Sequence, residues 1–114
     1  MTGKRFTLEK QAPVISYGAA CDAILATCRK SEEAARSDQV QVLVRKQDCV
    51  LTQLSGWDTL GFRGTCNEGF TLKSQGDIEQ ILPQPYADIH RETMHLFPRV
   101  VWNSPWLGLA IDAL

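Results

Sequence analysis

Along the first third of the chain, hydrophobic residues recur at intervals of three and four positions. The series runs through Tyr17, Ala20, Cys21, Ile24, Leu25 and Cys28. This spacing places the side chains on one stripe of an amphipathic helix. Ser16 suits the N-cap, and the polar run that follows Cys28 would extend the helix, exposed, to about Arg36. We therefore predict a long N-terminal helix, preceded by a short strand at 5–9 that Pro13 ends.

The middle of the chain alternates hydrophobic and polar residues, a pattern typical of strands. Residues 39–46 place three valines on one face, and residues 49–54 follow after a two-residue polar link, which predicts a hairpin. Two further runs, at 57–64 and 70–74, are each preceded by turn-forming residues. Four consecutive strands with short links favour an antiparallel meander, because parallel strands need longer crossover connections.

The last third of the sequence predicts several short helices. The first opens at 74–77, and Pro83 stops it. Pro85 suits the first turn of a second helix, which Pro98 ends. Residues 99–102 are predicted as a final strand, and a third helix begins near residue 105. The expected fold class is α+β: a mostly antiparallel four-stranded sheet packed by a long N-terminal helix and short C-terminal helices, in a single domain over residues 1–114.

The charge and the cysteine content of the chain limit the kinds of molecule that it is expected to bind and the compartment in which it is expected to occur. The formal net charge is −1, so no strong field of one sign draws the chain to nucleic acid or to an anionic membrane. No apolar run approaches the roughly 20 residues that span a bilayer, and Asp22 interrupts the one stretch that resembles a secretion signal. The four cysteines include no C-x-x-C pair. We expect free thiols, a cytoplasmic protein, and no nucleic-acid or membrane partner.

The two histidines are five residues apart, at His90 and His95. In an α-helix this spacing turns the two imidazoles about 140° away from each other, whereas a zinc pair needs i, i+4 spacing. The glycines at 56, 61 and 64 lack the spacing of a phosphate-binding loop. We therefore expect no metal and no cofactor. A cysteine–histidine nucleophile pair stays open, with Cys49 and Cys66 as the unassigned thiols and Cys66 as the more accessible one.

The C-terminal segment is apolar nearly all round. From Pro105 onward it carries a single charge, Asp112. A helix of this kind must be enclosed, and a small domain has little surface with which to enclose it. We expect a second copy of the chain to bury this helix in a two-fold interface. The alternative is that the helix is buried in the core of the monomer. The candidate interface residues are Trp102, Trp106, Leu107, Leu109, Ile111 and Leu114.

Two functional hypotheses follow, since no motif identifies a reaction. The first is a small, non-enzymatic, homodimeric binding module whose protein partners dock near Trp102 and Trp106. The second is a small-molecule pocket, with catalysis by His90 as its enzymatic form. That pocket would be lined by Tyr86, His90, Met94 and Trp57.

Overall fold

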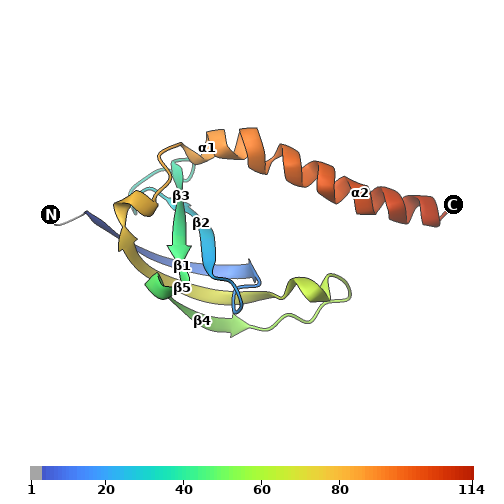
Figure 1. The fold of residues 1–114 in the computed structure, drawn as a ribbon, viewed down its shortest axis with the longest axis horizontal. Helices are drawn as coiled ribbons and strands as arrows, with labels where there is room; N and C mark the ends of the chain where they lie inside the picture. The colour runs from blue at the N-terminus through green and yellow to red at the C-terminus, as the bar shows by residue number, and fades with distance from the viewer. Residues whose placement is uncertain (1–3) are drawn as a thin grey trace. The chain divides into compact units, whose positions relative to one another are not determined.

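The computed structural model describes residues 4–114, which divide into two compact units. Unit 1 comprises the described chain up to Cys28 together with Gln41–Leu82, and unit 2 comprises Arg29–Val40 and Pro83–Leu114. Strands dominate unit 1 and helices dominate unit 2 (Figure 1). The predicted α+β class is confirmed, and the single domain over 1–114 stays a prediction.

The larger sheet of unit 1 has three antiparallel strands in the order β1-β5-β4 (Figure 1). They are β1 (Arg5–Ser16), β4 (Cys49–Ser55) and β5 (Asn67–Asp77). Strand β1 is longer than the predicted 5–9 segment because Pro13 does not end it. The register with β5 shifts between Ala12 and Ile15, so the proline, which cannot donate a ladder hydrogen bond, lies in an irregularity of the strand.

A second, two-stranded antiparallel sheet consists of β2 (Ala23–Arg29) and β3 (Gln39–Arg45). The strands predicted at 39–46 and 49–54 are therefore present, but the hairpin between them is wrong. A 3-10 turn at Lys46–Asp48 leads from β3 into β4, which belongs to the larger sheet. The four-stranded sheet is likewise corrected to sheets of three and two strands.

The long N-terminal helix is wrong, because its residues form the end of β1, a tight turn and β2. Tyr17 takes a left-handed conformation with φ of 54°, and its carbonyl accepts hydrogen bonds from the amides of Ala20 and Cys21 at 2.9 Å. A Cβ on Gly18 would lie 2.7 Å from the Phe70 ring, so the turn needs glycine for this close approach. In β2 burial alternates at the start of the strand, where Ile24 and Ala26 are less exposed than Ala23 and Leu25, and no helical stripe forms.

The predicted strand at 57–64 is also wrong, because this segment bonds to itself rather than to a neighbouring strand. The Trp57 indole donates to the Phe62 carbonyl at 2.9 Å, and Arg63 pairs with Asp58 at 3.0 Å. A 3-10 turn at Arg63–Thr65 follows. Gly61 and Gly64 in the segment weaken any strand and favour this local loop.

The C-terminal part is helical over more of its length than predicted. A 3-10 turn at Ile78–Gln80, capped by the Asp77 side chain, replaces the first expected helix. Then follow α1 (Tyr86–Ile89), a π-helical turn (His90–Met94) and α2 (Leu96–Asp112).

Helix α2 corrects three further expectations. Pro98 lies in its first turn, where an amide N–H is not needed, and so does not end a helix. Residues 99–102 are helical rather than a strand. Pro105 lies inside the helix instead of beginning it, and the hydroxyl of Ser104 donates to the Val100 carbonyl at 3.0 Å one turn earlier.

The hydrophobic core lies in unit 1 and draws on both sheets. Its buried apolar residues are Leu8, Ala12, Ala26, Val42, Val44, Phe70 and Leu72. The alternation predicted for β3 holds at Val42 and Val44, which are both buried. None of the helices within residues 4–114 has the length and apolar content that crossing a membrane would require.

Candidate functional site

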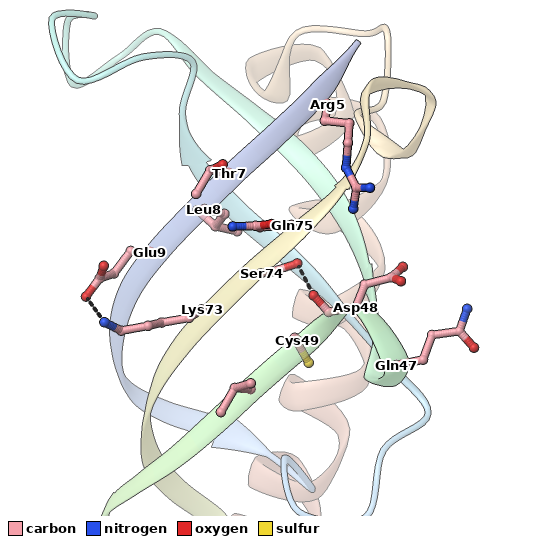
Figure 2. A pocket seen from close by; sticks show the side chains of 11 residues that line it. Arg5, Thr7, Leu8, Glu9, Gln47, Asp48, Cys49, Lys73, Ser74 and Gln75 are labelled. Atoms are coloured by element: carbon pink, nitrogen blue, oxygen red, sulfur yellow. Dashed lines mark hydrogen bonds and ion pairs between the residues drawn. The ribbon is translucent and has the colours of Figure 1, made fainter. Parts of the chain in front are cut away.

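A hollow of about 530 Å³ lies on the three-stranded sheet (Figure 2). Strands β1 and β5 supply one part of its lining, and the turn at Lys46–Asp48 and the start of β4 supply the rest. Lys73 pairs with Glu9 at 3.0 Å across the β1–β5 ladder, and the buried Ser74 hydroxyl donates to the Asp48 carbonyl at 2.9 Å. Charges of both signs lie around the hollow, so it does not select an ion of one sign.

Asp48 lines this hollow, and its carboxylate is held by hydrogen bonds. Its carboxylate accepts from the Arg45 guanidinium at 2.6 Å and from the Gln80 amide at 3.2 Å. The same Gln80 amide donates to the Leu43 carbonyl at 2.8 Å, so the network ties the end of β3 to the end of β5. The hydrogen bond from Arg45 is the main cause that lowers the pKa of Asp48, with Arg45's charge, Gln80 and Arg5 adding to it against partial burial. We therefore interpret this hydrogen-bond network as one that stabilises the fold and not as a reactive site.

We expect Asp48→Asn to destabilise the protein at neutral pH by an amount that shrinks as the solution is acidified. The native pKa of Asp48 is lowered, so its stabilising contribution is present above the ordinary aspartate pKa and is lost as pH falls through the native value. Urea unfolding of both proteins over a pH series measures the difference. Asp58→Asn, which removes an almost fully exposed carboxylate, is the control and should change stability little. A difference that stays constant with pH would contradict the assignment.

The cysteines near the sheets are poor nucleophiles. All four thiols are free, as predicted, and Cys66 is the exposed one. Burial raises the pKa of Cys28 despite the nearby Lys10 ammonium. Burial also raises the pKa of Cys49, with Cys21 and Asp48 adding to the effect. Because the thiolate is the reactive species, these shifts work against a nucleophilic role for Cys28 and Cys49.

A second hollow, of about 690 Å³, lies wholly on unit 2 and is open to solvent along α2. We call it the helical groove, and it is lined by His90, Met94, His95, Pro98, Arg99, Trp102, Asn103 and Trp106. The two tryptophan rings lie 6.2 Å apart between centroids. Tyr86 adjoins the groove through its ring, 5.6 Å from that of His90.

The two histidines of the groove lie together, which corrects the expectation that they point in different directions. The amide of His95 donates to the carbonyl of His90 at 2.7 Å, five residues back, which is the hydrogen bond of a π-helix. The extra residue in this turn brings His95 round above His90, so the imidazole centroids are only 5.3 Å apart. Both side chains are half-buried.

Every residue from Arg99 to Leu114, and so all of α2 after its first turn, is exposed in the single chain. At about 3.6 residues per turn, positions three and four apart stay on one side of a helix. One such row continues from the π-turn along α2, and we call it the α2 seam. Its members are His95, Pro98, Trp102, Trp106, Leu109 and Ala113. The first four of these residues also line the helical groove.

The structure brings together candidates that the sequence assigned to two different hypotheses. His90 and Met94, predicted for a pocket, line the same groove as Trp102 and Trp106, predicted for an interface. Trp57, the fourth pocket candidate, belongs to the loop of unit 1. Of the interface candidates, Leu109 lies on the seam with the two tryptophans. Leu107 and Ile111 lie on the other side of α2, and Leu114 lies beyond its end.

Sequence reasoning did not find Arg99 and Asn103 as lining residues of the groove. It predicted a strand at 99–102 and a new helix only from about residue 105. Helical periodicity continued through Pro98 was the signal that would have found them. Comparison of the chain with models of known protein families, with curated proteins and with solved structures finds no match in any of the three.

Proposed function

We propose that the chain is a non-enzymatic, homodimeric interaction module that pairs through the α2 seam. The observation that carries this proposal is a row of mostly apolar side chains along α2 that is exposed from Trp102 onward. The tryptophans and Leu109 are each more than two-fifths accessible to solvent. Contiguous exposed apolar surface of this kind marks interaction sites, and tryptophan is enriched at the centres of interfaces.

A second copy of the chain is the occupant that fits the seam best. His95, Trp102 and Leu109 repeat at intervals of seven, the repeat by which two like helices pair, and Pro98 and Trp106 lie on the same side of the helix. From Val100 to the end of the described chain, Asp112 is the single charged residue. Two copies therefore meet with little like-charge repulsion and bury apolar area worth about 25 cal/mol per Å² before ordering costs.

The volume of the helical groove also favours a small-molecule pocket as a second candidate function. Ligand pockets commonly enclose about 300–1,000 Å³, and the groove offers aromatic walls with the polar groups of His90 and Asn103. The groove is open along its length, however, and an open apolar channel suits a partner helix better than an enclosed ligand.

The free thiols of all four cysteines support the cytoplasm as the compartment.

Sedimentation velocity of the full chain tests the proposal directly. In the presence of a chelator and a reductant, we expect the mass of two chains at high micromolar concentration and dissociation on dilution. A monomer at high micromolar concentration would contradict the dimer. A broad metabolite screen by thermal shift separates the alternative: a ligand whose stabilising effect is lost in His90→Ala, combined with a monomeric mass, would favour the pocket.

A further inference from the structure

The separation of the two imidazoles in the π-turn matches that of two histidines on one metal ion. A zinc–nitrogen bond of about 2.1 Å leaves the metal about 3.2 Å from each ring centre, so two imidazoles at a tetrahedral angle have centroids about 5 Å apart. His90 and His95 show 5.3 Å, with their ring planes tilted by 53°. Both rings are half-buried at the groove, so solvent reaches them and an ion has an entry path.

The π-turn itself is the second observation. Single π-turns inserted in helices are rare and occur frequently at functional sites. An ordinary α-helical turn at the same place would separate the two rings, since five residues then span about 140° beyond a full turn. Here the irregular turn brings together the chain's only two histidines. It thereby brings together two imidazoles that regular helix geometry would have kept apart.

One chain supplies only half of a zinc coordination sphere. A structural zinc ion takes four protein ligands, and no group of three or more histidine, cysteine, aspartate or glutamate side chains suited to a metal occurs within residues 4–114. The carboxylates of the same helical stretch, Asp88 and Glu92, both pair with Arg91, at 3.3 and 3.7 Å. Further ligands must therefore come from outside the chain.

The α2 seam indicates where those ligands come from. His95 is the first residue of the seam, so two copies paired in parallel along it, about a two-fold axis, bring His95 opposite His95 and His90 opposite His90. The two histidines of each copy then place four imidazoles around one common position. This position lies at the end of the apolar contact that the tryptophans make. Four nitrogen ligands in a tetrahedral arrangement favour zinc among the divalent metals.

We propose that His90 and His95 of two copies of this chain together bind one zinc ion, which fastens the parallel dimer at the π-turn. This inference rests on the proposed dimer and adds to it a metal and an orientation. Zinc acts here as a structural link and not as a reaction centre, since four protein ligands leave no open position for a substrate.

Zinc titration of the reduced full chain, by calorimetry and by sedimentation velocity against a chelator, tests this site. We expect one zinc ion per two chains. Suppose that free zinc is present at a hundred times the constant for its dissociation from the dimer. The dissociation constant of the dimer into two chains should then fall about 100-fold, because the complete zinc site exists only in the dimer. A non-chelating reductant keeps the four thiols reduced throughout.

Two substitutions isolate the histidines. His90→Ala and His95→Ala should each abolish the effect of zinc on the dimer, and their helix content by circular dichroism should match that of the wild type. Glu92→Gln, in the same turn, is the control and should keep the full effect of zinc. Binding of zinc to thiols elsewhere would persist in all three variants, so the difference between them reports on the proposed site. An effect of zinc that survives both histidine substitutions would overturn the proposal.

The remaining outcomes separate this inference from the proposed function. A dimer that is equally stable with zinc and with chelator overturns the metal site and leaves the interaction module intact. A monomer in chelator that dimerises with zinc through the two histidines supports the site and shows that the apolar seam alone is insufficient. One zinc per chain without a change in mass overturns the shared site. A monomer that binds no zinc overturns both.

Discussion

Leu109→Glu is expected to dissociate the proposed dimer, raising its dissociation constant by at least about 100-fold. Leu109 lies on the α2 seam, so a two-fold interface would bury two glutamates, and desolvating an unpaired carboxylate costs several kcal/mol. Sedimentation velocity over a dilution series, with zinc absent, measures the effect.

The same helix offers a matched control for this substitution. Leu107 is two residues earlier, about 200° around the axis, and its exposure of 62% is close to the 68% of Leu109. Leu107→Glu makes the same chemical change on the other side of α2 and should leave the dimer unchanged. Equal effects of the two substitutions would mean that α2 does not pair through a single face. Dissociation by Leu107→Glu alone would assign the interface to the side of α2 that carries Leu107 and Ile111.

Leu72→Ala is expected to lower the free energy of unfolding of unit 1 by about 2–5 kcal/mol, the range found for leucines deleted from closely packed cores. Leu72 is 1% exposed and lies on the central strand β5, where it pairs with Lys10 of β1 and Leu51 of β4. Its removal therefore leaves a cavity that neighbours on two strands would have to fill. Urea unfolding followed by circular dichroism measures the loss.

Lys73→Ala is the control for the core substitution, because it alters the next residue of the same strand. The Lys73 side chain points out of the core and makes only the exposed ion pair with Glu9, which is worth about 0–1 kcal/mol. A loss as large for Lys73→Ala as for Leu72→Ala would show that strand propensity, rather than core packing, dominates the stability of β5.

The strands that the sequence predicted correctly are those with a single consistent pattern. In β3, alternating valines allow one buried face and leave no helical alternative, so Val42 and Val44 are buried as expected. Strand β5 was recognised at 70–74 only, because the turn-forming residues at its start and the glycine near its end hid the rest of the strand. Local patterns thus identified strand interiors better than strand ends.

The N-terminal helix failed because one set of residues fits two periodicities. Ile24, Leu25 and Cys28 match a helical stripe, whereas Ile24, Ala26 and Cys28 match the inward face of a strand. Pairing with β3, more than ten residues away, decides between the two, and no local pattern contains that information. The hairpin at 39–54 failed for a related reason: the link length is compatible with a hairpin, but β4 gains more by pairing with β5.

The candidate site was predictable in its residues but not in its geometry. The sequence indicated His90, Met94, Trp102 and Trp106, and all four line one groove. The contact between the imidazoles depends on the π-turn, and no residue type in the turn predicts an i, i+5 hydrogen bond. Regular helix geometry therefore led to the opposite expectation for the histidine pair.

The pairing of the first strand with the fifth has a consequence for the synthesis of this protein. Arg5 pairs with Asp77, so β1 meets its partner only after some seventy intervening residues have left the ribosome. Sheets with such sequence-distant pairings close slowly, on the scale of milliseconds to seconds. Until then β1 is unpaired on both sides, and the charged residues along it, Arg5, Glu9 and Lys10, discourage its association with other nascent chains.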